Sequence, residues 1–264
     1  MDLAWPKIPM PPSPLLYLVE GRAVGELATS YAVNPWLRKT MPRGDGHPVL
    51  VMPGFVASDI STQPLRRFLK QQGWSAHRWR QGRNLGFTEE LEERLANRLN
   101  ELYQAYQKPV SLVGWSLGGV YAREMARNNP EAVRCVISLG SPFAGSPKST
   151  NVWRIYELVV GMKIEDIDQA RLKLMRQPPP VPSTAIYSKT DGVAAWESCT
   201  EVSTERTENV EVRGSHCGLG FNPLVYTVIA DRLAQKPDRW QPFRRSGLRR
   251  HFYRRPSYPR QVEA

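Results

Sequence analysis

The amino-acid sequence predicts an α/β fold with a mostly parallel, twisted sheet, helices on both of its faces and a short helical lid. The main observation is an alternation, from residue 48 onward, between short apolar runs and longer amphipathic runs. The short runs have the length and composition of buried strands, and the longer runs have helical periodicity. Strands that alternate with helices pair in parallel. The length of 264 residues suits one sizeable core.

The predicted strands and helices follow one another along this whole region. Strands are expected at residues 48–55, 74–79, 110–115, 133–140, 183–189 and 209–213. Helices are expected at residues 63–73, 88–106 and 117–128, the second with Thr88 as its N-cap and the third halted by Pro130. In a parallel sheet of this kind, ligands bind beyond the carboxyl ends of the strands.

The composition divides the chain into three parts. Residues 1–46 are expected to form a helical extension, residues 47–238 the main α/β domain, and residues 239–264 a basic tail. Within the main domain, residues 142–182 contain two helix-like pieces bounded by proline and glycine, with no strand between them. An insertion at this point would lie over the strand ends, and we therefore expect it to form a lid.

The helical extension carries apolar residues at helical spacing, interrupted by glycines. These residues are Leu15, Leu18, Val19 and Leu27. The pattern predicts an amphipathic helix that packs on the core of the protein. A helix that lies in a membrane interface is the alternative.

The formal net charge of +11 is concentrated near the carboxyl end, where eight arginines fall between Arg239 and Arg260. The rest of the chain is only mildly basic and lacks the basic patches interleaved with aromatic residues that bind nucleic acid. We therefore expect no specific nucleic-acid partner and a solvated, disordered tail. An anionic membrane surface or another polyanion is the partner that such a tail would attract.

The three cysteines, Cys135, Cys199 and Cys217, are too few for a disulfide framework and have no metal-site spacing. Cys217 is expected to act as a small buried hydrophobe rather than as a nucleophile. The chain has no run of about 18 consecutive apolar residues and no secretory leader. These features predict a cytoplasmic protein without metal or cofactor, with contact at the inner face of the membrane as a further option.

The sequence Gly-Trp-Ser-Leu-Gly at residues 114–118 places Ser116 between a predicted strand and a predicted helix. The G-x-S-x-G pattern alone is weak evidence, but this strand-turn-helix context is the one that identifies a nucleophile elbow. Glycines at positions 114, 118 and 119 allow the strand and the helix to cross closely, and the strained turn lifts the serine hydroxyl clear of the sheet. Ser116 is therefore the candidate nucleophile, against the alternative of an ordinary helix N-cap.

A serine nucleophile needs a base, and the chain offers four histidines. His216 follows the last predicted strand, at the carboxyl edge where Ser116 also emerges. The other histidines precede the first strand, lie within the second strand or fall in the tail; they are His47, His77 and His251. His216 is therefore the candidate base.

The base in turn needs an acid that holds its ring in one tautomer. Asp191 follows the penultimate predicted strand, in the segment Thr-Asp-Gly, and faces the same edge of the sheet. An Asx-turn is the competing interpretation of this residue. Weaker candidates for the acid are Asp166, Asp168 and Glu197.

An attacking serine creates an oxyanion, which needs prearranged N–H donors. One expected donor is the backbone amide of Leu117, directly after the nucleophile and at the positive end of its helix. The other is the amide of Phe55 in the segment Pro53–Phe55, because proline has no N–H and Gly54 lets the backbone approach closely. A plain Pro-Gly turn is the alternative.

At these residues the chain resembles the α/β-hydrolase family, specifically its serine lipases and esterases. The resemblance runs from about Pro48 to Leu233 and is carried by "GWSLGG", "PGF", "TDGV" and "GSHCGLGFNP", and by the order Ser, Asp, His. It implies hydrolysis of an ester, amide or thioester through an acyl-enzyme. Many relatives have His-Gly in the oxyanion loop, whereas this chain has Pro-Gly, a variant of lipase-like and GPI inositol-deacylase-like members. That departure affects the expected substrate class more than the mechanism.

Apolar residues in the lid and in the loop after the first strand predict a site for an apolar acyl chain. The candidate substrate-binding residues are Val56, Trp115, Trp153 and Tyr156. The alternative is that the lid residues only pack onto the core. The sequence thus predicts a carboxylesterase or lipase with a small-molecule ester or lipid as substrate. An acyltransferase or thioesterase with the same triad, and a non-catalytic binding protein that kept the fold, are the other hypotheses.

Overall fold

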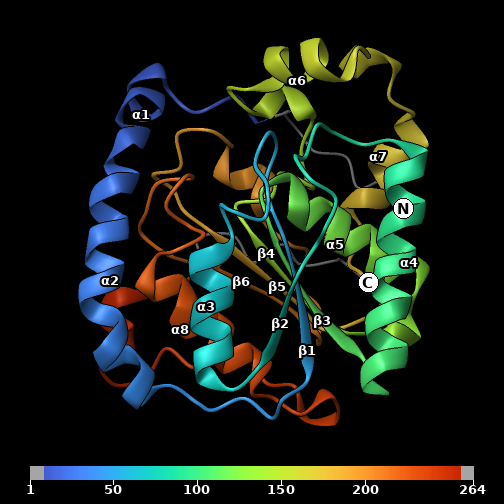
Figure 1. Ribbon diagram of the computed structural model, residues 1–264. Helices are drawn as coiled ribbons and strands as arrows, with labels where there is room; N and C mark the ends of the chain where they lie inside the picture. Colours follow the sequence, from blue (N-terminus) through green and yellow to red (C-terminus); the bar gives the residue numbers. More distant parts are fainter. Residues whose placement is uncertain (1–8, 257–264) are drawn as a thin grey trace.

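The computed structural model describes residues 9–256 (Figure 1). Its centre is a six-stranded sheet with the order β2-β1-β3-β4-β5-β6, in which every neighbouring pair is parallel. The strands are β1 (Pro48–Met52), β2 (Ser75–Arg78), β3 (Val110–Trp115), β4 (Val133–Leu139), β5 (Ser183–Tyr187) and β6 (Thr207–Glu211). The predicted α/β fold with a parallel sheet is therefore confirmed.

The α-helices of the described residues lie on both faces of this sheet and across its upper edge (Figure 1). They are α1 (Pro14–Leu18), α2 (Ala23–Thr40), α3 (Gln63–Gln72), α4 (Glu89–Tyr106), α5 (Leu117–Asn128), α6 (Trp153–Val160), α7 (Gln169–Arg176), α8 (Pro223–Leu233) and α9 (Arg249–Phe252). Helices α6 and α7 belong to the segment expected to form a lid, and α6 crosses above the carboxyl ends of the strands (Figure 1). No helix within residues 9–256 is both long and apolar enough to cross a bilayer.

Alternate residues of the central strands β1 and β3 face two separate cores, as the period of two in a strand requires. In β1, Val49 and Val51 face a core that α3 and α8 close, whereas Leu50 and Met52 face a core that α4 and α5 close. Helix α4 begins where the sequence predicts, since Thr88 accepts a hydrogen bond from the Leu91 amide at 3.1 Å. The two-sided burial holds the strand ends, and with them the loops of the candidate site, in fixed positions.

The N-terminal extension is helical as expected, but it does not bury the apolar residues that suggested an amphipathic helix. Leu15 and Leu18 are 70% and 78% exposed, so the expectation that these residues pack on the core was wrong. Helix α2 instead lies along α3 and α8, as an outer layer (Figure 1). Hydrogen bonds to Glu20 and Glu26 join this segment to the main domain.

Most side chains of residues 239–256 are exposed, as expected, but the expectation that this segment is disordered was wrong. The rings of Phe243 and Tyr253 are buried in the α8 side of the core and contact each other edge to face at 4.8 Å. The Phe243 amide donates to the Glu208 carboxylate at 2.8 Å, and Arg254 bridges to Glu211 in antiparallel fashion. This segment covers the outer edge of β6, which would otherwise expose unpaired backbone groups. Residues 257–264 lie outside the described residues.

Candidate active site

Ser116 lies on a sharp turn between β3 and α5. Its backbone angles are φ 53° and ψ −123°, a combination that residues other than glycine rarely adopt. The turn is held from both sides, because the Ser116 amide donates to the Leu139 carbonyl at 2.8 Å and its carbonyl accepts from the Gly119 amide at 2.9 Å. The surrounding hydrogen bonds thus enforce the strained geometry that a nucleophile elbow has.

Glycines surround this turn where backbones approach too closely for side chains. A β-carbon on Gly114 would lie 2.3 Å from the Gly118 carbonyl oxygen, and one on Gly118 would lie 2.5 Å from the Met52 carbonyl oxygen. A β-carbon on Gly119 would lie 2.0 Å from the Ser141 hydroxyl. The absence of side chains therefore lets α5 press against β3 and β1, as the sequence pattern predicts.

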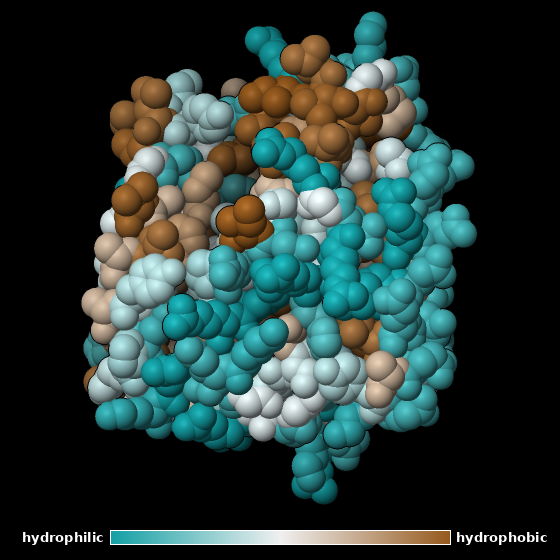
Figure 2. Space-filling model, in the orientation of Figure 1, coloured by the Kyte–Doolittle hydropathy of each residue, from teal (hydrophilic) through white to brown (hydrophobic). Residues whose placement is uncertain are grey.

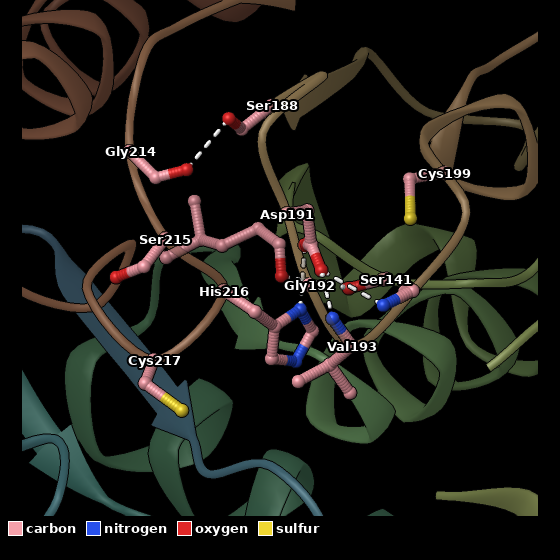
Figure 3. Close-up of polar contacts among 12 residues, drawn as sticks. Ser141, Ser188, Asp191, Gly192, Val193, Cys199, Gly214, Ser215, His216 and Cys217 are labelled. Carbon is pink, nitrogen blue, oxygen red and sulfur yellow. Dashed lines mark hydrogen bonds and ion pairs between the residues drawn. The ribbon is translucent and has the colours of Figure 1, made fainter. Parts of the chain in front are cut away.

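Asp191 and His216 meet beyond the carboxyl ends of β5 and β6 (Figure 3). His216 Nδ1 lies 2.6 Å from Asp191 Oδ2, and both side chains are buried. The other carboxylate oxygen of Asp191 accepts from the amides of Val193 and Ala194, both at 2.8 Å. The carboxylate is thus fixed on one side by the backbone and holds the imidazole on the other.

The pKa of His216 is raised above its ordinary value. Burial is the largest single influence on this pKa and lowers it, because burial disfavours the charged ring. The charge of Asp191, its hydrogen bond to the ring and the charge of Glu20 together outweigh burial and favour the imidazolium. An imidazole in this environment readily takes up a proton.

The elbow and the histidine loop are joined through a neighbour of the serine. The Trp115 indole donates to the His216 carbonyl at 3.1 Å, so β3 carries both Ser116 and a support of the histidine loop. Within residues 9–256, no hydrogen bond joins the Ser116 hydroxyl to His216. Such bonds are often long in the absence of substrate, so the geometry allows a base role without showing it.

The two amides expected to bind an oxyanion belong to Leu117, directly after Ser116, and to Phe55, next to Gly54 in the loop that contacts the elbow. Gly54 is so close to the serine that a β-carbon there would lie 3.1 Å from the Ser116 β-carbon. Within residues 9–256, neither the Phe55 amide nor the Leu117 amide donates to a protein acceptor. The Val56 amide, in contrast, is occupied by the Asn84 carbonyl at 2.7 Å. Phe55 and Leu117 thus retain the free N–H groups that their expected role requires.

Sequence reasoning missed Asn84, which shapes the loop that carries Phe55. Its buried side chain donates to the Pro53 carbonyl at 3.0 Å and accepts from the Tyr121 hydroxyl at 3.0 Å. Its backbone exchanges hydrogen bonds with Val56 and Ala57. No motif marks this residue, because its partners come from two distant parts of the chain, residues 53–57 and Tyr121.

A cavity of about 290 Å³ opens beside Ser116 and is lined in part by residues of α6 and α7. Its walls are mainly apolar, and they include Phe55, Phe87, Val120, Trp153, Tyr156 and Met175. The Phe55 and Tyr156 rings contact each other with centroids 5.3 Å apart, which links the oxyanion loop to α6. Apolar side chains also gather on the outer surface over α6 (Figure 2), where Leu158 is 83% exposed.

The cavity contains two of the four expected substrate-binding residues. Trp153 and Tyr156 line it, but Trp115 and Val56 do not. The Trp115 ring packs against Gly220 behind the histidine loop, where a β-carbon on that glycine would lie 2.7 Å from the ring. Val56 has a φ of 52° and is 44% exposed.

The other histidines and acids occupy separate places. His47 is buried against Asp45 and Ser111 at the amino end of the sheet, and His77 contacts the Tyr106 hydroxyl at 3.0 Å. Asp168 caps α7 at the cavity wall, where it accepts from the Ala170 amide at 2.9 Å. In the part of the chain that the structure describes, no group of three His, Cys, Asp or Glu side chains could hold a metal ion.

One family model and one curated relative match part of the chain. The family model of lecithin:cholesterol acyltransferase matches residues 75–163, a segment that includes the elbow. The mouse (Mus musculus) phosphatidylcholine-sterol acyltransferase is 35% identical over 69 residues, which cover 24% of this chain and 16% of that protein. The chain thus matches only a small part of this curated relative.

Two solved structures share the architecture over most of the chain. Aspergillus fumigatus lipase B superposes with a TM-score of 0.55 and 19% identity, covering 77% of this chain and 59% of the lipase. The mature Bacillus licheniformis lipase BlEst2 superposes with a TM-score of 0.55 and 15% identity, covering 73% of this chain and 94% of the lipase. The parallel sheet, the elbow serine and these neighbours together show that the chain has the α/β-hydrolase fold.

Proposed function

We propose that the chain is a serine hydrolase of the esterase or lipase type, with Ser116 as nucleophile, His216 as base and Asp191 as the acid that orients the base. The observation that carries this proposal is the Asp191–His216 pair, joined at 2.6 Å at the same edge of the sheet as the strained elbow. A buried carboxylate paired with histidine beside an elbow serine is the arrangement that activates a hydroxyl for acyl transfer.

The reaction follows from the placement of these groups. The Ser116 hydroxyl attacks the ester carbonyl while His216 Nε2 accepts its proton, and Asp191 stabilises the resulting imidazolium through Nδ1. The oxyanion accepts hydrogen bonds from the amides of Phe55 and Leu117. His216 then gives its proton to the leaving alkoxide, which departs as the alcohol and leaves an acyl-enzyme. Water, activated by His216, attacks this ester and releases the acid and the free serine.

The substrate class follows from the cavity. An opening of about 290 Å³ with mainly apolar walls suits the acyl chain of a small-molecule ester or lipid. Trp153 and Tyr156 would contact this chain from the lid side. A series of p-nitrophenyl esters of increasing acyl length tests this, with Ser116→Ala as the inactive control. Hydrolysis of these esters at equal rates by the wild type and by Ser116→Ala would contradict the proposal.

Acyl transfer to an alcohol is the second candidate function. It is favoured by the match of residues 75–163 to the lecithin:cholesterol acyltransferase family. The two functions differ only in whether water or another hydroxyl resolves the acyl-enzyme. Mass spectrometry of products formed with and without added alcohols distinguishes them, because a transferase yields a new ester at the expense of free acid. Thioester substrates, tested in the same assay, identify a thioesterase.

We further propose that the protein is cytoplasmic and touches an anionic membrane surface. The cysteines Cys135, Cys199 and Cys217 are all free thiols, as a reducing compartment favours. Exposed arginines of the C-terminal segment, such as Arg244 and Arg250, would supply the charged part of this contact. Co-sedimentation with anionic and neutral vesicles tests this, since charge-driven binding must weaken as salt is raised.

A further inference from the structure

Glu20 lies in the short turn Val19–Arg22 between α1 and α2, yet it reaches the centre of the candidate site. Its side chain is buried, and its carboxylate accepts hydrogen bonds from three backbone amides. Oε1 accepts from Gly192 at 2.7 Å and from His216 at 2.9 Å, and Oε2 accepts from Cys217 at 2.8 Å. These amides belong to the two loops that carry Asp191 and His216, so a single carboxylate joins both loops.

A second carboxylate of the same segment supports the histidine loop. Glu26 accepts from the Ser215 amide at 2.9 Å and from the Ser215 hydroxyl at 3.0 Å. Arg22, which pairs with Glu26 at 3.4 Å, donates to the Thr190 carbonyl in the acid loop. The N-terminal segment therefore holds both loops at several points.

The fit between these parts leaves no room for additional atoms. A β-carbon on Gly192 would lie 2.3 Å from the Leu16 carbonyl oxygen, and one on Gly218 would lie 1.6 Å from Glu26 Oε2. Glycine at these two positions lets the loops approach the N-terminal segment directly. The contact is thus a packed interface rather than a loose apposition of the extension on the domain.

The hydrogen bonds that Glu20 accepts favour the ionised form of its carboxylate. Burial, the largest single influence, opposes ionisation, but the hydrogen bonds from Cys217, His216 and Gly192 outweigh it and lower the pKa of Glu20. The charged groups that act on His216 are Asp191, from the acid loop, and Glu20, from the N-terminal segment. Cys217 is exposed, so the expectation that it is a buried hydrophobe was wrong. Its thiol nevertheless stays neutral, since partial desolvation and then the charge of Glu20 raise its pKa to about 12.

We propose that Glu20 is a positioning residue, which fixes the main chain of the Asp191 and His216 loops so that the imidazole faces Ser116. The expected effect of Glu20 on catalysis rests on the proposed function. The expected effect of Glu20 on the order of the two loops does not. This positioning role makes the N-terminal helical segment a required part of the active site. Removing the carboxylate leaves three buried or half-buried amides without an acceptor and frees the two loops to move apart.

The test compares Glu20→Gln with Glu20→Asp and with the matched control Glu93→Gln, which changes an exposed glutamate on α4. The first measurement is amide hydrogen exchange by NMR. In Glu20→Gln the remaining carbonyl oxygen can still accept from the Gly192 and His216 amides, but the new NH2 group faces the Cys217 amide. Exchange should therefore rise at least about tenfold at Cys217 and by a smaller factor at Gly192 and His216, while the rest of the domain is unchanged. The second measurement is the NMR titration of the His216 ring, whose pKa should fall because a facing negative charge is gone.

The third measurement is the pH profile of kcat and KM on a small neutral ester. We expect kcat of Glu20→Gln to fall by about 10²-fold with KM nearly unchanged, since a misplacement of about 1 Å has this cost. The acid limb of the profile should move to lower pH together with the ring titration. Glu20→Asp, which keeps the charge but not all of the reach, should restore the pKa of His216 more fully than it restores kcat.

Wild-type exchange rates at these three amides, or an unchanged His216 titration in Glu20→Gln, would overturn the proposal. A general loss of exchange protection across the sheet would also overturn it, because it would make Glu20 a structural residue of the whole domain. If no ester is turned over by any variant but the exchange and titration results hold, the proposed function fails and the positioning role of Glu20 stands.

Discussion

Gly54 faces Ser116 at a distance that leaves no space for a methyl group, because a β-carbon at residue 54 would lie 3.1 Å from the Ser116 β-carbon and 3.4 Å from the Trp115 carbonyl oxygen. Gly54→Ala should therefore push the loop that carries Phe55 outward by a few tenths of an ångström. We expect kcat to fall by about 10-fold to 10²-fold with little change in KM, since an oxyanion donor acts mainly in the transition state. Gly25→Ala, where a β-carbon meets nothing within 4 Å, is the control and should leave both constants unchanged. If both substitutions had the same effect on kcat, the close contact between Gly54 and Ser116 would have no role in positioning the oxyanion donor.

Ser116 has a positive φ although it carries a side chain. Its replacement by glycine should therefore abolish activity but increase the stability of the fold. Both Ser116→Ala and Ser116→Gly should abolish ester hydrolysis and fluorophosphonate labelling. Only Ser116→Gly relieves the backbone strain at φ 53°. Its free energy of unfolding should therefore exceed that of Ser116→Ala by about 1 kcal/mol. Denaturant titration followed by circular dichroism measures this. Identical midpoints for the two variants would show that the elbow is not strained.

Asp191 uses both of its oxygens, one for His216 and one for two backbone amides. Asp191→Asn can keep the backbone bonds through its carbonyl oxygen, but it then presents an NH2 group to His216 Nδ1 and favours the wrong tautomer. We expect kcat to fall by about 10⁴-fold while the fold is retained. Glu197→Gln, a change at a candidate acid outside the pair, serves as control. Near-normal turnover of Asp191→Asn would exclude this residue as the orienting acid.

The raised pKa of His216 predicts opposite pH trends for activity and for stability. The base must be neutral, so kcat/KM should rise with pH through a midpoint above the ordinary value of 6.5. The folded state favours the protonated ring, so its contribution to stability is complete below 6.5 and is lost as pH rises through the folded-state pKa. Rate measurements and urea titrations from about pH 6 to pH 9 test both trends, with His216→Asn as the variant that lacks the stability trend. A kcat/KM midpoint below 6.5 would contradict the assignment of the Asp191 and Glu20 charges.

The parts of this molecule that sequence predicts are those encoded by local periodicity and by chain order. Strand-like runs such as 110–115 and 133–140 alternate with helical ones, which sets the parallel sheet and brings loops that follow successive strands to one edge. That logic alone places Ser116, Asp191 and His216 at the same end of the sheet. It does not fix the direction of each side chain, which is why Trp115 and Val56 were expected in a cavity that they do not line.

The parts that sequence does not predict depend on contacts between distant segments. Glu20 meets His216 across 196 positions of chain, and nothing in its neighbourhood distinguishes it from a solvated glutamate. Asn84 is similar, since its role arises only where three segments meet. For the C-terminal segment the prediction failed for a different reason. Its arginine-rich composition indicates a solvated segment, but two aromatic residues, Phe243 and Tyr253, bury enough surface to hold it against the domain.

Docking of the C-terminal segment predicts that this basic stretch contributes to stability. Phe243 is 3% exposed, and the guanidinium groups of Arg232 and Arg249 lie over its ring at 5.8 and 5.1 Å. Phe243→Ala should lower the free energy of unfolding by about 3 to 5 kcal/mol, through lost burial and an unfilled cavity. Leu248→Ala, at a side chain that is 81% exposed in the same segment, should change it by less than about 0.5 kcal/mol. Urea unfolding of the two variants decides the matter, because a solvated segment would give both substitutions the same negligible effect.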